Sequence, residues 1–275
     1  MNEIVMLFLV GSLGGIISGM FGIGGGVIYV VVFNIYLKKN HPELVHNDAM
    51  LVQLTLINSI FSIFFGAFSG FLKQVKSRNF YPNLVLQTGI PALFTAILGT
   101  ILVAHWEGYN KKIFFSVFTI FLIPMLFKVL PTKKEVVEND QLDKKYFGLT
   151  GLLTGLCTAF TGLGGGVVIN PILNGLLKYP IKKTFSISQG VMLITTFGIS
   201  IFHLFNKNEG IEALEADFYS GINLKMTFPV IIGMIIFAPF GVTLAQKTPA
   251  KLLQLLFAIV CLAIIIRNLF QIFGT

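Results

Sequence analysis

Long apolar blocks dominate this chain and constrain its fold more than any other feature. Eight can be read between short polar breaks, at residues 4–37, 49–72, 84–104, 113–130, 147–177, 185–205, 226–245 and 252–273. Blocks of this length can cross a hydrocarbon core about 30 Å thick as helices that rise about 1.5 Å per residue. Only 12% of the 275 residues are charged, about half of what a soluble domain carries. The sequence therefore predicts an all-α polytopic membrane protein and excludes a water-soluble globule.

The charge pattern and the cysteines argue against several other classes. The net charge is +8, but the 20 Lys and Arg residues lie between apolar blocks, as loop charges do that orient membrane helices. Cys157 and Cys261 lie within apolar blocks, which argues against a disulfide framework or a metal cluster. Because Met1–Glu3 carry no basic residue, we expect a retained membrane segment rather than a signal peptide. We expect no nucleic acid, metal or cofactor, and a multi-pass protein of the cytoplasmic membrane.

The two halves of the chain repeat each other, and this repeat is the most informative feature of the sequence. Shifting residues 11–38 by 140 positions gives 11 identities in 28 positions, including Gly24–Val27 on Gly164–Val167. The predicted organisation is a first membrane repeat, a charged linker and a second membrane repeat, at residues 1–130, 131–145 and 146–275. Each repeat has four apolar segments.

The first segment of each repeat is too long for a simple span. Residues 4–37 as one helix would be about 50 Å long. Both segments contain Gly-X-Gly-Gly-Gly, at Gly22–Gly26 and Gly162–Gly166, and each glycine weakens a helix by about 1 kcal/mol relative to alanine. We therefore expect both helices to break at these glycines.

Helix breaks at matching positions of two repeats point to a central binding site, because irregular backbone inside a membrane must be buried in protein or line a cavity. A helix that restarts at Val27 or Val167 would direct free N–H groups and the positive end of its dipole at that site, which suits a small anion. Close helix packing is the alternative role for glycine. It fits Gly11 and Gly15, whereas packing does not need three glycines in a row. The predicted substrate-binding glycines are Gly24, Gly25, Gly26, Gly164, Gly165 and Gly166.

Duplicated halves that each open with a Gly-X-Gly-Gly-Gly element resemble the TauE/SafE family of sulfite and organosulfur-anion transporters. The strongest marks are residues 15–26 and 155–171, including Asn170-Pro171 after the second glycine element. The first half departs from that pattern with Val30-Val31, so we expect its half-helix to differ in shape. The resemblance implies transport of sulfite, thiosulfate, an organosulfonate or a related small anion, with Asn170 near the site. It fixes neither the anion nor the direction.

Polar residues within the apolar blocks supply further candidates. A shift of 136 pairs Gln53 with Gln189, and two such amides could donate hydrogen bonds to one shared oxyanion. Interhelical hydrogen bonding is the alternative role for both. Ser188 is a weaker candidate because it is next to Gln189 in the sequence.

Ionisable residues are scarce inside the blocks. We expect no acid or base deep within a segment apart from His203, which argues against an elaborate proton relay. His203 is interpreted as a packed or interfacial histidine. Asp48, at the mouth of the second segment, could simply meet water. Gating or coupling is the alternative role for both residues.

Two topologies remain open. If all eight segments cross, the two faces carry 11 and 9 basic residues; if the first and fifth are re-entrant, the counts are 13 and 7. The second topology inverts the halves and places the linker in the cytoplasm and the termini outside. We favour it because inverted half-sites can expose one anion site alternately to either side.

A secondary transporter that works by alternating access is therefore the leading functional hypothesis, with a lipid bilayer and a small sulfur-containing anion as partners. A passive anion channel, or a transporter of another small anion, is the alternative. An intramembrane enzyme lacks support, because the sequence has no His-Glu-x-x-His, Gly-x-Ser-x-Gly or paired membrane aspartates.

Overall fold

The protein is nearly all helical in this computed structural model, which describes residues 2–105, 119, 122–124, 126–130, 144–205 and 218–273. The first half forms α1 (Glu3–Phe21), α2 (Gly26–Asn40), the short 3-10 helix η1 (Pro42–His46), α3 (Asp48–Lys76) and α4 (Pro82–His105). The second half forms α6 (Lys144–Thr161), α7 (Gly166–Asn170), the π-helix η2 (Pro171–Leu176), α8 (Ile181–Phe205), the strands β1 (Phe218–Tyr219) and β2 (Ile222–Asn223), α10 (Leu224–Lys247) and α11 (Ala250–Phe273).

Polar caps and prolines explain several helix boundaries. The side-chain oxygen of Asn47 accepts a hydrogen bond from the Met50 N–H at 3.1 Å and starts α3, while Asn223 caps α10 through the Met226 N–H at 3.0 Å. Such caps satisfy amide groups that a helix start leaves without an intrahelical acceptor. The π-helix η2 begins at Pro171, which has no N–H to continue the α-helical pattern of α7.

Six helices in the described part of the chain are long and apolar enough to cross a membrane, judged by length and composition. They comprise Glu3–Phe21, Met50–Lys76, Pro82–Leu102, Ile181–Phe205, Leu224–Lys247 and Ala250–Phe270. The prediction of a helical, multi-pass membrane protein is therefore confirmed, although the described chain also contains the short strands β1 and β2.

Some sequence expectations fall wholly or partly on chain that the structure does not describe. Of the fourth predicted segment, residues 113–118, 120, 121 and 125 lie outside the described residues, as do residues 131–143 of the predicted linker. The connection between α8 and α10 is described only from Phe218 onward, where a two-stranded antiparallel hairpin pairs Phe218 with Asn223.

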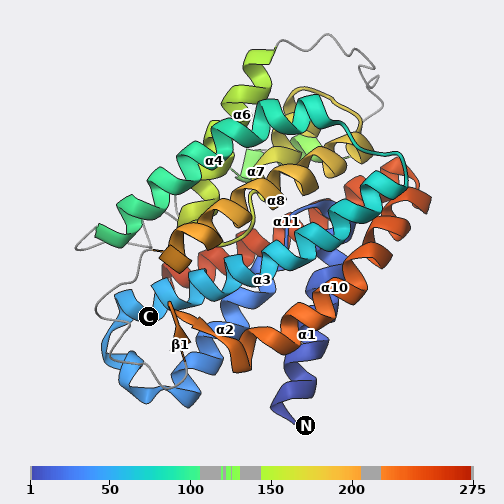
Figure 1. The fold of residues 1–275 in the computed structure, drawn as a ribbon. Coiled ribbons are helices and arrows are strands. Elements are labelled where there is room, and N and C mark those ends of the chain that lie inside the picture. Colours follow the sequence, from blue (N-terminus) through green and yellow to red (C-terminus); the bar gives the residue numbers. More distant parts are fainter. Residues whose placement is uncertain are drawn as a thin grey trace.

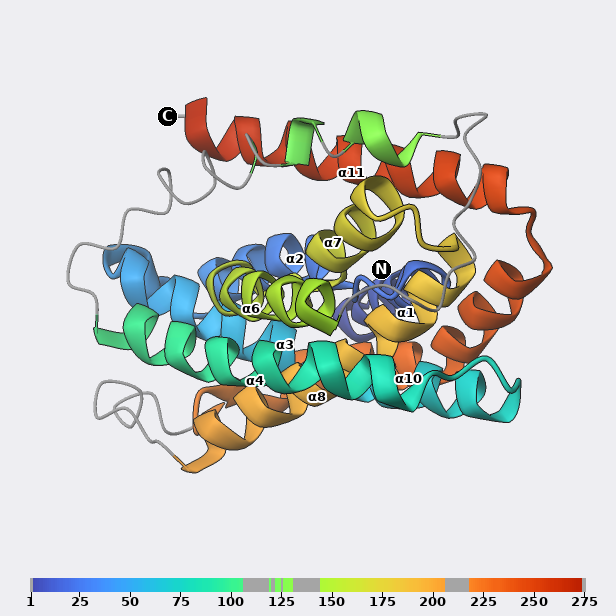
Figure 2. The same cartoon turned by 90° about the horizontal axis from the view of Figure 1, so that it is seen from above.

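The helices form three layers. α3, α4, α8 and α10 lie in front in Figure 1, α1, α2, α6 and α7 form a middle layer, and α11 runs along the back. Figure 2 shows the same order from above, with α11 on the side opposite α4. The two glycine-rich segments belong to the middle layer, between α1 and α2 and between α6 and α7.

Small residues let the middle helices approach the front ones closely. A Cβ atom on Gly11 would overlap the backbone of Val230 in α10, and one on Gly15 would lie 3.0 Å from the Cα atom of Met234. In the second half, a Cβ on Gly151 would overlap the carbonyl oxygen of Thr88 in α4. The packing role predicted for Gly11 and Gly15 is confirmed by these contacts.

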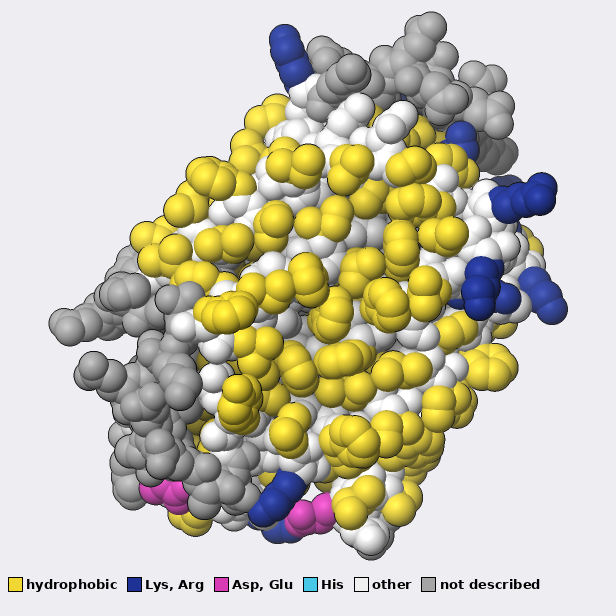
Figure 3. All heavy atoms as spheres, viewed as in Figure 1, with side chains coloured by type: hydrophobic (Ala, Val, Ile, Leu, Met, Phe, Trp, Pro, Cys, Tyr) yellow, Lys and Arg dark blue, Asp and Glu magenta, His cyan; other side chains and the backbone are white. Residues whose placement is uncertain are grey.

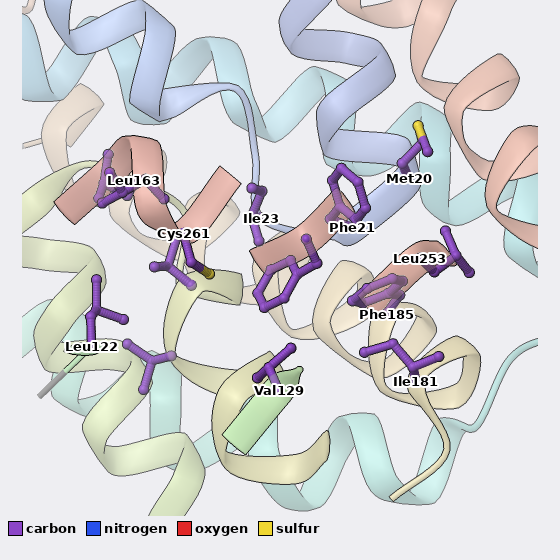
Figure 4. Packing of buried hydrophobic residues seen from close by; sticks show 14 of the residues in the cluster. Met20, Phe21, Ile23, Leu122, Val129, Leu163, Ile181, Phe185, Leu253 and Cys261 are labelled. Atoms are coloured by element: carbon purple, nitrogen blue, oxygen red, sulfur yellow. The ribbon is translucent and has the colours of Figure 1, made fainter. Parts of the chain in front are cut away.

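A large cluster of buried apolar residues surrounds the glycine-rich segments. Ile23 and Leu163, the second residues of the two Gly-X-Gly-Gly-Gly elements, are both completely buried and belong to it. Figure 4 shows Ile23 in the same cluster as Phe21, Phe185 and Cys261. Each element is therefore anchored by an apolar side chain that points into the protein interior.

The two ends of the molecule differ in charge. Figure 3 shows apolar side chains over the middle of one face, Lys and Arg at one end, and Asp and Glu together with further Lys or Arg at the other. At the end that carries the N-terminus, Lys39 pairs with Glu3 at 2.6 Å and joins the end of α2 to the start of α1. Because its ammonium group is hydrogen-bonded to the Glu3 carboxylate, the pKa of Lys39 is raised above its ordinary value.

Candidate functional site

The two glycine-rich segments, Gly22–Gly26 and Gly162–Gly166, lie directly against each other; we call them the first and second glycine loops. A Cβ atom on Gly166 would overlap the carbonyl oxygen of Gly22, and one on Gly26 would overlap that of Gly162. Larger residues are excluded because the two backbones touch. Gly22 also has φ of +63°, a left-handed conformation that residues with a Cβ atom rarely adopt. The loops therefore bring irregular backbone from both halves together in the protein interior.

Each loop is held by a serine from the other half of the chain. The Ser188 hydroxyl of α8 donates a hydrogen bond to the Gly22 carbonyl oxygen at 2.7 Å. The Ser59 hydroxyl of α3 donates one to the Gly162 carbonyl oxygen at 3.1 Å. Both serines are completely buried, so these bonds satisfy carbonyl groups that have left a helical pattern.

The start of α2 leaves backbone donors at the first loop. The N–H groups of Ile28 and Tyr29 both donate to the Gly25 carbonyl oxygen, at 2.9 and 3.0 Å. The N–H groups of Gly26 and Val27 precede this first helical bond and belong to the amides that a helix start leaves without an intrahelical acceptor. The positive end of the α2 dipole lies at the same place. The loop can therefore offer hydrogen-bond donors and partial positive charge to a ligand.

A cavity of about 190 Å³ opens beside the first glycine loop, between it and α11. Only apolar atoms of the described residues face it, and its lining consists of Ile17, Gly24, Gly25, Val27, Ile28, Ile259, Val260 and Ala263. We call this space the α2–α11 cavity. Two of the predicted substrate-binding glycines line it, at the point where α2 begins.

The second loop differs from the first in its surroundings. Gly165, with φ of +69°, begins α7 beside Thr154 and Thr158 of α6. At the matching place in the first half, the Tyr29 ring occupies the space next to Gly25. The two loops are therefore related in sequence but lined by different side chains.

Asn170, Ser188 and Gln189 all lie near the first loop. The Asn170 amide donates to the Phe21 carbonyl oxygen at 2.6 Å, and the Gln189 amide donates to the Ala67 carbonyl oxygen of α3 at 3.3 Å. Among the described residues, no group donates to the side-chain oxygen of Asn170 or of Gln189, and both oxygens are buried. They could accept hydrogen bonds from a water molecule or a protonated solute.

Gln53 and His203 contact different neighbours from Gln189. They line a separate cavity of about 20 Å³, enough for one water molecule, together with Thr100 and four apolar residues. The structure therefore brings Gln53 close to His203 and does not place it beside Gln189. Asp48 is the first residue of α3, and its side chain lies outside the described part of the structure.

Sequence reasoning gave no role to Arg267, which lies in the candidate membrane span Ala250–Phe270 of α11. The structure buries all three of its guanidinium nitrogens, so the expectation that His203 would be the one ionisable group deep within a segment was wrong. A shift of 139 positions pairs Lys128 of the first half with Arg267 of the second. A basic residue inside an apolar block was the signal that could have singled it out.

Comparison with known proteins agrees with this architecture. The family model described as sulfite exporter TauE/SafE matches residues 7–268. A probable membrane transporter protein of Methanocaldococcus jannaschii is 29% identical over 256 residues, which cover 91% of this chain and 90% of the relative.

Two probable membrane transporter proteins of Haemophilus influenzae also match. One is 25% identical over 62% of each chain, and the other is 24% identical over 70% of this chain and 69% of its own. No solved structure matches significantly. With a family match over nearly its whole length and six helices able to span a membrane, the chain belongs to the sulfite exporter TauE/SafE family of membrane transporters.

Proposed function

We propose that the protein is a secondary transporter that moves a small sulfur-containing anion, such as sulfite, thiosulfate or an organosulfonate, across the cytoplasmic membrane by alternating access. The description of its family as sulfite exporters supports the substrate class. The relatives named as probable membrane transporter proteins support transport rather than catalysis.

The contact between the two glycine loops is the observation that carries this proposal. Gly166 lies against the Gly22 carbonyl, and Gly26 against the Gly162 carbonyl. Irregular backbone inside a membrane is costly unless it lines a cavity or is buried in protein, because its polar groups would otherwise lack hydrogen-bond partners. Here it meets the start of α2, whose first amide groups have no intrahelical acceptor, and the apolar α2–α11 cavity lies beside it.

Alternating access requires two related halves that can exchange conformations. We propose that the halves are inverted repeats, each opening with a segment broken at its glycine loop. The reciprocal serine bonds to Gly22 and Gly162 support this arrangement. So do Ile63 of α3 and Met192 of α8, because a Cβ atom placed on Gly24 or on Gly164 would meet both of these side chains. A rocking motion of one half against the other would exchange the conformations of the two loops. The site would then open to one side of the membrane and afterwards to the other.

Charge at the two ends supports an orientation. Lys73, Lys76 and Arg78 lie around the connection between α3 and α4, and Lys247 and Lys251 around that between α10 and α11. We propose that this end faces the cytoplasm, because basic residues concentrate in cytoplasmic loops. The N-terminus and the end of α11 would then face outside.

Sulfite uptake into proteoliposomes tests this function. A transporter is expected to show saturable uptake that thiosulfate or an organosulfonate inhibits and that an excess of chloride does not. Gly25→Leu should abolish uptake while the protein still inserts, because a side chain there would overlap the Tyr29 ring. Gly165→Leu should also abolish uptake, because a side chain there would overlap the side chains of Thr154 and Thr158. Gly148→Leu is the matched control, since nothing lies within 4 Å of a Cβ atom at that position.

Two results would contradict the proposal. Uptake that does not saturate and that remains selective for anions would indicate a passive channel. Normal uptake by both loop variants would remove the glycine loops from the transport site.

A further inference from the structure

The small cavity beside His203 is formed by helices from both halves of the chain. It is lined by Gln53, Leu56, Ile57 and Ile60 of α3, Thr100 of α4, Ala159 of α6 and His203 of α8. We call it the Gln53–His203 cavity. Polar as well as apolar atoms face this space of about 20 Å³, which suits one water molecule held by polar partners. A sulfur oxyanion is larger than one water molecule, so the cavity is too small for the transported anion.

His203 is unusual among the residues of the membrane spans. Within the six candidate spans it is the only histidine, and Glu3 at the start of α1 is the only acid. Glu3 pairs with Lys39 at the end of the molecule. Histidine is the side chain whose charge ordinarily changes near neutral pH, and an ionisable residue inside a membrane span usually has a functional role. His203 is therefore the residue of these spans best suited to take up and release a proton.

The polar groups around the cavity leave hydrogen-bonding capacity for a water molecule. The Thr100 hydroxyl donates to the Ala96 carbonyl oxygen at 2.8 Å, so its oxygen can still accept a hydrogen bond. No hydrogen bond within the described part of the chain includes the Gln53 amide or the His203 imidazole. A water molecule between them could accept from a protonated imidazole and donate to the amide oxygen of Gln53. The cavity can thus solvate an imidazolium without a carboxylate.

Few titratable groups surround His203 in the described part of the chain. The residues of α3, α4 and α6 that line the cavity include no other acid or base, and the His203 ring contacts Phe202 on its own helix. Cys157 of α6 packs instead against the apolar cluster around the glycine loops. Asp48 and His105 lie at the ends of α3 and α4 nearest to the cavity, and their side chains lie outside the described residues.

An apolar layer closes one side of the cavity. Ile60, Ala96 and Ile199 form a separate buried cluster, and Ile60 also lines the cavity. Ala96 and Ile199 each precede a cavity residue, Thr100 and His203, by about one helical turn. Because α4 and α8 both begin at the basic end of the molecule, this layer lies between the cavity and that end. In this conformation His203 is therefore separated from the proposed cytoplasmic side.

The cavity is also next to the second glycine loop. Leu56 lines the cavity, and a Cβ atom on Gly162 would overlap the Leu56 side chain. Ala159, on the opposite wall, precedes Gly162 by less than one helical turn. Ser59, beside Ile60 on α3, donates to the Gly162 carbonyl oxygen. A shift of α3 against α6 at the cavity would therefore displace the second glycine loop.

From this geometry we propose that the Gln53–His203 cavity is a proton-binding site and that the anion crosses the membrane together with a proton carried by His203. A proton from water on one side forms an N–H bond with the neutral imidazole, and this bond breaks again when the proton returns to water on the other side. The positive charge of the imidazolium offsets the charge of the anion during the crossing. Gln53 and Thr100 are positioning residues that hold the water molecule. This inference rests on the proposed function and adds the coupling ion to it.

Uptake of radiolabelled thiosulfate into proteoliposomes tests the coupling, with the membrane potential clamped by potassium and valinomycin. Unlike sulfite, thiosulfate takes up no proton near neutral pH, so any proton that accompanies it must be carried by the protein. With wild type, an inwardly directed proton gradient should raise the initial uptake rate several-fold over uptake at equal pH. A protonophore should remove this gain.

His203→Gln should lose the response to the proton gradient. It should still exchange labelled for unlabelled thiosulfate at equal pH, because exchange needs the anion site but no net movement of protons. His41→Gln is the matched control, since His41 lies outside the six candidate spans and already contacts Glu43 and Asn223. This variant should keep the full response.

Gln53→Leu provides a second test that does not remove the histidine. The imidazolium would lose a hydrogen-bonded water molecule, so more acid would be needed to protonate His203. The pH of half-maximal gradient-driven uptake should fall by about 0.5–1 unit. A purely structural role of Gln53 would lower the rate at every pH and leave this midpoint unchanged.

Three results would overturn the proton site. His203→Gln could respond to the gradient like wild type. Wild type could show saturable uptake that ignores the proton gradient. His203→Gln could also lose exchange together with the gradient response, while Gln53→Leu keeps the wild-type midpoint, which would indicate that both residues are structural.

The same assay distinguishes a failure of this inference from a failure of the proposed function. Saturable uptake of sulfite and thiosulfate without any response to the proton gradient would overturn the role of His203 and leave the transporter standing. Uptake of neither anion by wild type would overturn the transport function itself.

Discussion

The hydroxyl group of Ser188 donates a hydrogen bond to the carbonyl oxygen of Gly22 over 2.7 Å, although 166 positions separate the two residues in the chain. Ser59 makes the reciprocal bond to the carbonyl oxygen of Gly162. Each glycine loop is thus fixed by a helix from the other half. A movement of one half would therefore displace both loops, which is the coupling that the proposed alternating-access mechanism requires.

Removing either serine hydroxyl should destabilise the protein. Ser188→Ala or Ser59→Ala leaves a buried carbonyl oxygen without its donor, at a cost of about 1–3 kcal/mol. Thermal unfolding in detergent measures the effect. Ser69→Ala, which removes an exposed bond to the Ile235 carbonyl oxygen, should change stability by less than about 0.5 kcal/mol. Equal stability losses in all three variants would show that the loops are not held in this way.

The contact between the loops should tolerate no added methyl group. Gly166→Ala places a Cβ atom on the Gly22 carbonyl oxygen, and relieving that overlap must separate the loops. We expect sulfite uptake to fall at least about tenfold with membrane insertion retained, a loss of about 1.4 kcal/mol or more. Gly148→Ala on α6 is the control, since a methyl group there meets open space. Wild-type uptake by Gly166→Ala would contradict the observed packing.

Asn170 should contribute more than its counterpart in the first half. Its amide donates to the Phe21 carbonyl oxygen at the end of α1, whereas Val30 occupies the corresponding sequence position. Asn170→Val leaves that buried carbonyl oxygen unpaired, so unfolding should become easier by about 1–3 kcal/mol. Asn40→Ala, which removes an exposed bond to the Tyr36 carbonyl oxygen, provides the comparison. If the two variants unfold at the same temperature, the Asn170 hydrogen bond does not contribute to the stability of the protein.

Alanine substitutions at Gln189 and Gln53 should affect the KM for sulfite to different extents. Gln189 lies beside Gly22 and bonds to α3, so Gln189→Ala is expected to raise the KM for sulfite several-fold, by about 1 kcal/mol of binding. Gln53 lines a cavity the size of one water molecule with His203, and Gln53→Ala should change the KM less. Initial uptake rates over a range of sulfite concentrations provide the test. A larger increase in KM for Gln53→Ala than for Gln189→Ala would contradict this prediction and would place the anion site near His203.

Periodic and repeated features of the sequence were enough to predict the fold class and the packing glycines. Runs of apolar residues indicate membrane helices directly, because a helix needs about 20 such residues to cross the hydrocarbon core of a bilayer. Gly11 and Gly15 could be assigned to packing because their spacing of four places both on one helix face. Their contacts with Val230 and Met234 confirm that role.

Contacts between segments distant in the chain could not be read from the same signals. Sequence matching pairs Gln53 with Gln189, whereas the contacts with the glycine loops instead relate Ser59 to Ser188. Apolar helices align almost equally well in several registers, because most of their residues are interchangeable in the core. Arg267 was missed for a related reason. Its burial depends on what surrounds α11, and an arginine six residues before the end of that helix could equally have reached water.

The most direct measurement of the central claim is an experimental structure of the protein with selenite, a heavier analogue of sulfite whose selenium can be located by anomalous scattering. The account predicts one selenium peak beside the first glycine loop, within reach of the Gly26 and Val27 N–H groups at the start of α2. A selenium peak elsewhere, or a cation bound between the two glycine loops, would contradict it.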